Sequence, residues 1–584
     1  MRAVFISTPN KCLIKSDIYR QIVQKLVECQ IMKNDKNSSP LVRLTKLIHS
    51  ERDDILLLLY LTLGYGLLSI ATPVAVQALV NNVTMGGVIE PLVVISIILF
   101  ALLVLSGFLY VLEAYVVEYI QRRLFVETAM QVTNKVQGAM INIYDKTNPV
   151  ELVNRFFDIA TIQKSAATLL TVGLIAIIQV VIGSIILIFY SIYFALVVAL
   201  IFLFFWFTLS VLGKNATQTA IEESKAKYAM AAWLETIAGN FYLFKFYNGL
   251  YRATVFTNKL ADKYLNKRAS HFSCLLWQTF GAVMFYAFIG TAMLVIGGIL
   301  VVNGQMNLGQ FVASELIFFS VLAALVRLVS KFGDYYDILA AIDKLGVLDD
   351  LPQEEIKDNQ TSFDALSTLS VTALNFAYSH RIHPIKDINF TLSKGSSLAI
   401  MGISGTGKST IIDLVTGLRT PDKGQIEYNN VDLRQINRLA LRNCIGIATK
   451  VEIFEGTILE NILLDNTNIS MHEINAVLGA LGLIDDFSKL EHGLNTQLTS
   501  FGAPLSTTQL QRLMVVRAIV TKPDLLIIDG IIDNLNPQQI EIVIHYLIER
   551  KQDWMLLMTT RSDHIAKQFD HQLKLVDLME QANK

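Results

Sequence analysis

Six long apolar runs in the first part of the chain constrain its fold more than any other feature of the sequence. Each run carries few charges and is long enough to form a membrane-crossing α-helix, which takes about 20 residues. Of the 584 residues, 53% are hydrophobic and only 17% are charged, which excludes an ordinary soluble protein of this length. The predicted spans are 55–80, 92–117, 166–190, 192–212, 273–302 and 309–326.

The third and fourth runs meet at "FYSIYF", which leaves almost no connection between them. A single helix through both runs would be far longer than a bilayer is thick. The sequence therefore predicts two separate helices joined in a tight hairpin.

Basic residues lie on alternate sides of the predicted spans. Arg43, Lys46 and Arg52 precede the first span, whereas the connection "NNVTMGGVIEP" that follows it has no Lys or Arg. The hairpin tip and "VNGQMNLGQ" also lack both, while basic residues return after the second and fourth spans, at Arg122, Arg123, Lys135, Lys146, Lys214, Lys225 and Lys227. Positive charge marks the cytoplasmic side, so both termini are predicted to be cytoplasmic.

The chain changes character after Leu345. Between the spans, charged stretches such as "NATQTAIEESKAKYAMAAWLETIAG" have the pattern of helices that continue into the cytosol. After the polar linker "LPQEEIKDNQTS", β-rich runs alternate with helical patterns, which indicates an α/β domain. The predicted divisions are a short cytoplasmic N-terminal segment, a six-span domain, a linker and a final domain, at 1–40, 41–345, 346–365 and 366–584.

Charge and cysteine content exclude several classes of partner and site. The net charge is −1, so no overall basic field indicates nucleic acid as a partner. The four cysteines are scattered, without the paired spacing of a disulfide framework or a zinc site. They are predicted to be free thiols, at Cys12, Cys29, Cys274 and Cys444.

The final domain contains a glycine-rich phosphate-binding motif. "SLAIMGISGTGKSTIIDLV" combines a strand, a loop and the start of a helix, and it matches G-x-x-x-x-G-K-[ST] at Gly402, Gly407, Lys408 and Ser409. Glycines allow backbone N–H groups to wrap phosphates, and the lysine neutralises phosphate charge. The predicted fold class is therefore an all-α six-helix transmembrane domain with cytosolic helix extensions, followed by an α/β P-loop nucleotide-binding domain.

A carboxylate at the end of a second apolar strand fits the same chemistry. Asp529 ends "LLIID" and would supply the carboxylate that Mg²⁺ needs beside the hydroxyl of Ser409, either by direct contact or through a bound water. Taken alone, Asp529 would more often be a strand-end cap. Its position after the phosphate loop favours the metal role.

Several motifs resemble, in order and spacing, the nucleotide-binding domain of an ATP-binding-cassette exporter: "FAYSH", "GISGTGKST", "GIATKVEIFEGTILENI", "LSTTQLQRLMVVRAIVTKPDLLIIDG" and "MLLMTTRSD". The six-span region resembles the membrane domain of that family, most of all in bacterial peptide, toxin or type I secretion exporters. The resemblance covers about residues 40 to 575.

The resemblance implies a half-transporter in the lipid of a bacterial inner membrane that exports an unknown peptide, protein or amphipathic substrate. It implies ATP and Mg²⁺ as cofactors. It also implies a second half-transporter as partner, either an identical copy or a catalytically intact relative, because each nucleotide lies between the phosphate loop of one subunit and the signature motif of the other.

The family's nucleotide contacts carry over to matching positions of this chain. Tyr378 stands where an aromatic ring stacks on adenine, with a strand-face aromatic as the alternative reading. "LSTTQ" stands where the family has "LSGGQ", so Ser506 and Gln509 match while Thr507 and Thr508 replace glycines. The phosphate loop matches fully, at Gly402, Gly405, Gly407, Lys408, Ser409 and Thr410.

The family's catalytic positions are substituted. Gly530 stands where a glutamate polarises the attacking water, Thr560 where a histidine contacts the γ-phosphate, and Thr449 where a glutamine links metal and membrane domain. Asn536 replaces a further aspartate. A positioned acid or base is typically worth about 10²–10⁴ in rate. The chain is therefore predicted to bind ATP and to hydrolyse it weakly or not at all.

Four other side chains are weighed as candidates. Asp533 and His564 could replace the missing catalytic groups, although a surface carboxylate and a solvated histidine are the commoner readings. Glu113 and Glu315 are carboxylates in or near predicted spans, where ionisable groups mark functional sites. For Glu315 the alternative is a helix–helix hydrogen bond. A non-pumping regulatory or scaffold protein that uses ATP as a structural ligand is the alternative to an export subunit.

Overall fold

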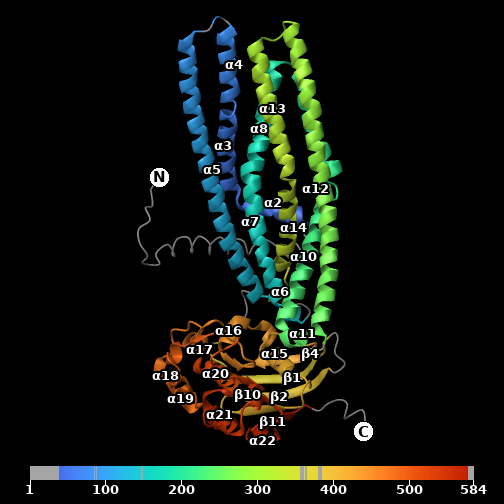
Figure 1. Ribbon diagram of the computed structural model, residues 1–584. Helices are drawn as coiled ribbons and strands as arrows, with labels where there is room; N and C mark the ends of the chain where they lie inside the picture. The colour runs from blue at the N-terminus through green and yellow to red at the C-terminus, as the bar shows by residue number, and fades with distance from the viewer. Residues whose placement is uncertain are drawn as a thin grey trace. The chain divides into compact units, whose positions relative to one another are not determined.

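The computed structural model describes residues 39–575, except 85, 87, 146–148, 247, 355–360, 362, 364 and 379–383. The chain divides between Gln353 and Glu354 into two compact units, which Figure 1 shows in blue to yellow-green and in yellow to red. Most of the predicted N-terminal segment, including Cys12 and Cys29, lies outside the described residues. Cys274 is a free thiol, as predicted.

The first unit is all-helical. Its α-helices are α2 (Pro40–Ser50), α3 (Arg52–Leu68), α4 (Ala71–Thr84), α5 (Ile89–Gln137), α6 (Pro149–Asn154), α7 (Asp158–Thr168), α8 (Leu174–Tyr190), α9 (Phe194–Phe207), α10 (Ala216–Gly239), α11 (Phe241–Lys245), α12 (Gly249–Val302), α13 (Leu308–Ser330) and α14 (Phe332–Asp349). Among the described residues, six helical segments are long and apolar enough to cross a membrane: Arg52–Thr84, Ile89–Gln137, Glu151–Tyr190, Phe194–Leu212, Gly249–Val302 and Leu308–Asp349. The six predicted spans are confirmed.

The hairpin and the helix extensions are present too. Helix α8 ends at Tyr190, Ser191 is extended, and α9 begins at Phe194 and packs beside α8. The 49 residues of α5 and the 54 residues of α12 form single helices. At about 1.5 Å per residue, each is longer than a ~30 Å hydrocarbon core is thick, so each continues beyond it.

Close helix packing builds the core of this unit. Helix α13 packs against α8, α4 and α12, and α10 packs against α12 and α14, as the long ribbons in Figure 1 show. Gly183 of α8 faces Val321 of α13 so closely that a Cβ on Gly183 would lie 2.3 Å from the Val321 side chain. Glycine at this position allows the two backbones to approach.

The second unit contains two main sheets. The parallel sheet has the order β11–β3–β10–β9–β6 and the antiparallel sheet the order β2–β1–β4–β5. The strands are β1 (Thr368–Phe376), β2 (Ile385–Ser393), β3 (Ser397–Met401), β4 (Lys423–Tyr428), β5 (Val431–Asp432), β6 (Ile445–Ala448), β7 (Gly456–Thr457), β8 (Gln497–Leu498), β9 (Leu525–Asp529), β10 (Met555–Thr560) and β11 (His571–Lys574).

Helices pack around these sheets to complete an α/β architecture, which agrees with the predicted fold class. They are α15 (Lys408–Val415), α16 (Arg438–Asn443), α17 (Ile458–Leu463), α18 (Met471–Ala480), α19 (Ile484–Ser488), α20 (Thr507–Val520), α21 (Pro537–Glu549) and α22 (Asp563–Ala566). Leu, Ile and Met side chains of β3, β9 and β10 are buried on both faces of the sheet, as expected of central parallel strands.

The register of the parallel sheet brings the ends of β3, β9 and β10, and the candidate site residues that follow them, to one edge. Met401 of β3 pairs with Thr560 of β10, and Thr559 of β10 pairs with Asp529 of β9. The three strands therefore end side by side. In open α/β sheets, ligands bind beyond the carboxyl ends of the strands, so the loops that follow these three strands form the candidate site.

Candidate functional site

The loop from Gly402 to Gly407 joins β3 to α15 and has the backbone of a phosphate cradle. Gly405 and Gly407 have φ angles of +92° and +96°, in the left-handed region that L side chains rarely adopt. Gly407 is the N-cap of α15, and no side chain caps the first turn of that helix. The first-turn N–H groups are therefore available to an anion.

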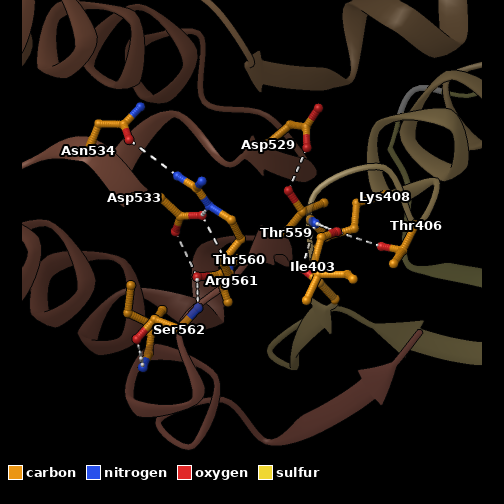
Figure 2. Close-up of polar contacts among 12 residues, drawn as sticks. Ile403, Thr406, Lys408, Asp529, Asp533, Asn534, Thr559, Thr560, Arg561 and Ser562 are labelled. Atoms are coloured by element: carbon orange, nitrogen blue, oxygen red, sulfur yellow. Dashed lines mark hydrogen bonds and ion pairs between the residues drawn. The ribbon is translucent and has the colours of Figure 1, made fainter. Parts of the chain in front are cut away.

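Lys408 places its ammonium inside this loop. Its Nζ donates to the carbonyl oxygens of Gly402 at 2.6 Å and Ile403 at 2.8 Å, as Figure 2 shows in part. Burial lowers the pKa of Lys408, although the carboxylates of Asp533 and Asp529 act in the opposite direction. Loop glycines, uncapped amides and an enclosed ammonium together fit the phosphates of a nucleotide.

Asp529 lies at the end of β9, where its Oδ1 accepts a hydrogen bond from the Thr559 hydroxyl. Ser409, its predicted partner for Mg²⁺, is exposed at the start of α15. Within the described ranges, no group of three His, Cys, Asp or Glu residues could hold a metal. One hydroxyl and one carboxylate suit Mg²⁺ only if phosphate oxygens and water complete its octahedron.

Gly530 has a left-handed backbone, with φ +62° and ψ 0°, and it begins the short 3₁₀ turn Ile531–Asn534. A Cβ built on it would contact only the Thr559 hydroxyl, at 3.8 Å. Space for a side chain exists, but an L residue in this conformation costs roughly 1–2 kcal/mol. The local backbone here suits glycine.

Asp533 is not the surface carboxylate that the sequence suggested. Its side chain is 7% exposed. Its Oδ1 accepts from the Thr560 hydroxyl at 2.7 Å, and its Oδ2 accepts from the Arg561 backbone N–H at 3.1 Å. Both oxygens are thus engaged, because the turn after Gly530 brings Asp533 against the end of β10 (Figure 2). His564 is 75% exposed beside Glu541, as a solvated histidine would be.

Tyr378 contacts both the phosphate-loop helix and a cation. Its hydroxyl lies 3.2 Å from the Thr410 hydroxyl, and the Cζ of Arg419 lies 4.8 Å from its ring centroid. Arg419 in turn donates to Asp413 at 2.9 Å. Sequence reasoning missed Arg419, since no motif includes it and only the fold places it over the ring.

Ser506 and Gln509 form a capping box at the start of α20. The Ser506 N–H donates to Gln509 Oε1 at 2.8 Å, and the Gln509 N–H donates to Ser506 Oγ at 3.3 Å. Thr507 and Thr508 occupy the first turn. Within the part of the chain that the structure describes, no hydrogen bond links Ser506 or Gln509 to the phosphate loop.

The other substituted positions have local surroundings only. Thr449 follows β6 and is half-buried. Asn536 caps α21, where its side chain accepts from the Gln539 N–H at 2.8 Å. Neither residue brings a carboxylate or an amide to the edge where β3, β9 and β10 end.

The two candidate carboxylates of the first unit, Glu113 and Glu315, are buried to different degrees. Glu113 is fully buried on α5. Both carboxylate oxygens of Glu315 on α13 are buried without a hydrogen-bond partner among the described residues. The helix–helix hydrogen bond that was the alternative for Glu315 is therefore absent there, and its role in a transport pathway stays a prediction.

Two family models match this chain, one in each unit. The model for the ABC transporter transmembrane region matches residues 55–325, and the model for the ABC transporter matches residues 385–532. Together with the six spans, these matches show an integral membrane protein whose second unit is an ATP-binding domain.

The curated relatives include toxin exporters. The leukotoxin export ATP-binding protein LtxB of Aggregatibacter actinomycetemcomitans is 27% identical over 277 residues, which are 47% of this chain and 39% of that protein. The alpha-hemolysin translocation ATP-binding protein HlyB of Escherichia coli O157:H7 is 29% identical over 250 residues, 42% and 35% of the two chains. The aligned region thus spans less than two-fifths of these relatives' length.

A solved structure has the same fold. A bacterial Atm1-family ABC exporter with ATP bound matches with a TM-score of 0.77 at 18% identity, covering 91% of this chain and 94% of the other. At that identity the match concerns the fold alone. The chain therefore has the fold of an ABC exporter. The two family models show that it belongs to the ABC transporter family and joins the family's transmembrane region and ATP-binding domain in one polypeptide.

Proposed function

We propose that this chain is an export subunit that binds ATP through its own phosphate loop and hydrolyses it weakly or not at all. The observation that carries the proposal is the edge where β3, β9 and β10 end. There the loop with Lys408 is complete, Asp529 is in place, and Gly530 offers no carboxylate in its left-handed turn.

Each residue of this edge has a distinct part in binding. The amides at the start of α15 and the Lys408 ammonium bind and orient phosphate oxygens. Ser409 and Asp529 would hold Mg²⁺, and the Tyr378 ring would stack on the base. ATP supplies the phosphoanhydride bond whose hydrolysis drives transport in this family.

Hydrolysis is weak because none of Gly530, Asp533 and Thr560 offers a free base to activate water. The nearest replacement carboxylate, Asp533, already accepts hydrogen bonds on both oxygens. The hydroxyl of Thr560 donates its hydrogen bond to that same carboxylate. Losing a positioned base costs about 10²–10⁴ in rate, or roughly 3–5 kcal/mol of barrier.

Export needs a second cassette, so the working unit is a dimer with an identical copy or with a catalytically intact relative. We place it in a bacterial inner membrane with both termini cytoplasmic, in agreement with the alternation of basic residues between the spans. The relatives' names support a peptide, protein or amphipathic substrate.

The missing carboxylate also favours a second function. A subunit that holds ATP without turnover could use it as a structural ligand and regulate or scaffold a partner. Transport by the purified chain with its partner in proteoliposomes separates the two, since a scaffold would move no substrate.

The test measures ATP binding and ATP turnover separately on the purified full-length chain. Lys408→Ala should weaken Mg·ATP binding at least tenfold, because a charge-assisted contact to phosphate is lost. Lys489→Ala, which removes an exposed lysine of the same unit, is the matched control. Equal affinity in Lys408→Ala and the parent chain would refute binding through this loop, and turnover at an ordinary exporter's rate would refute weak hydrolysis.

A further inference from the structure

A second cationic residue, Arg561, follows the end of β10 directly beside the phosphate loop. Met401 and Thr560 are paired neighbours at the ends of β3 and β10. The next residue on one strand is Gly402, which opens the phosphate loop, and the next on the other is Arg561. Adjacent strands lie about 4.8 Å apart, so Arg561 starts within a few ångström of the loop that is built for anions.

Arg561 is held by the turn that follows β9. Its Nε donates to Asp533 Oδ2 at 3.4 Å, and one terminal nitrogen donates to Asn534 Oδ1 at 3.2 Å. The guanidinium side chain is still 53% exposed, whereas its carboxylate partner is 7% exposed. Figure 2 shows this side chain lying over Asp533 and Asn534. The arginine is therefore reachable from solvent while its counter-charge is fixed in the protein.

Both charges act on the phosphate loop. The Asp533 carboxylate raises the pKa of Lys408 and the Arg561 guanidinium lowers it, against a larger lowering by burial. A phosphate beside Lys408 would feel the same two charges with opposite sign. Of the two, Asp533 has the larger effect on the pKa of Lys408.

We propose that Arg561 is a phosphate ligand of this nucleotide site and that Asp533 is the positioning residue that holds it back. The pair thereby sets how tightly the chain binds the charged end of ATP. This inference rests on the proposed ATP binding. A charge-assisted contact to phosphate in a partly exposed site changes affinity by roughly three- to tenfold.

The experiment compares the full-length chain in lipid nanodiscs with Asp533→Asn, Arg561→Gln and the double variant. The asparagine removes the charge and keeps an acceptor for the Thr560 hydroxyl, and it loses the acceptor for the Arg561 backbone N–H. Asp533→Asn should bind Mg·ATP about three- to tenfold more tightly, and Arg561→Gln should bind it more weakly by a similar factor. The double variant should bind like Arg561→Gln, because Asp533 acts through Arg561.

Two controls separate a charge effect from a structural one. Adenosine, which has no phosphate, should bind all four chains equally. Asp432→Asn removes a carboxylate that is paired with Arg434 and similarly buried, at 11% exposure beside a 62% exposed arginine. That variant should leave Mg·ATP affinity unchanged.

A structural role for Asp533 gives a different pattern. Weaker binding of both ATP and adenosine by Asp533→Asn, or an equal change whether or not Arg561 is present, would overturn the inference while leaving ATP binding itself established by the Lys408→Ala comparison. A parent chain that binds no ATP would overturn the proposed function, and this inference with it.

Discussion

At the scale of single residues, the backbone conformation of Gly530 favours glycine at the position where the family has its catalytic glutamate. Its left-handed conformation is one that glycine adopts at little cost. The neighbouring carboxylate, Asp533, is turned away from catalysis by its contacts with Thr560 and Arg561. We therefore expect a site without a base, which one substitution does not restore.

Gly530→Glu alone should give no robust ATPase activity. A glutamate in this left-handed conformation costs roughly 1–2 kcal/mol of backbone strain. In addition, Thr449, Thr560 and the Thr507–Thr508 signature remain unchanged. Residues that act as a unit are not additive in catalysis. Steady-state ATPase of the purified chain checks this, with Gly530→Ala as the control for strain without a carboxylate. A single variant that turns over like an ordinary exporter would contradict the prediction.

Tyr378→Ala should weaken Mg·ATP binding by about three- to tenfold, because stacking of an aromatic ring is worth roughly 0.5–1.5 kcal/mol. Tyr378→Phe keeps the ring under Arg419 and loses only the hydroxyl contact to Thr410, so it should stay within about twofold of the parent chain. Titration with ATP and with inorganic triphosphate makes the test. Equal losses for the two ligands would mean that the ring does not contact the base.

At the scale of elements, two kinds of contact decide the structure. In the first unit, small residues determine how closely two helices approach, as Gly183 does between α8 and α13. In the cassette unit, the register of β3, β9 and β10 sets which loop residues meet. The contact between helices can be tested by replacing a glycine with alanine, which adds a single carbon atom.

Gly183→Ala should destabilise the protein by about 1–3 kcal/mol, since its Cβ would meet the Val321 side chain at 2.3 Å in a packed core. Gly298→Ala on α12 is the matched control, because a Cβ there has nothing within 4 Å. The control should be neutral or slightly stabilising, since alanine favours helix more than glycine. Thermal unfolding in detergent measures both, and equal melting temperatures would contradict the packing argument.

At the scale of the whole molecule, both faces of the cassette carry substitutions. On the proposed assignment, the site at this chain's own phosphate loop lacks its base, and its signature would cover a partner's nucleotide with Thr507 and Thr508 in place of glycines. The branched side chains of these residues at the first turn of α20 oppose close approach. Any complex that contains this chain should therefore cycle slowly.

Thr507→Gly with Thr508→Gly should speed a heterodimer with an intact partner more than Gly530→Glu does. The glycines restore close approach at the site where the partner supplies every catalytic group, whereas Gly530→Glu repairs one of several losses at the other site. The measurement is steady-state ATPase of the co-expressed pair with each change. The reverse ranking would refute the argument.

The six spans, the hairpin after Tyr190 and the phosphate loop could be predicted from the sequence because each depends on local chemistry. A run of about 20 apolar residues forms a helix in a bilayer whatever its neighbours are. Closely spaced glycines followed by lysine form a cradle between any suitable strand and helix. Asp529 was predicted too, because it directly ends an apolar strand.

The surroundings of that loop were decided by the tertiary structure alone. Asp533 and Thr560 are 27 residues apart, and they meet only because β9 and β10 pair in one particular register. Arg419 lies over Tyr378 for a similar reason, across the strands of the second sheet. A contact of this kind depends on strand order and pairing, which hydropathy and motif spacing do not encode, so a carboxylate that looked solvated in the sequence is buried against an arginine in the fold.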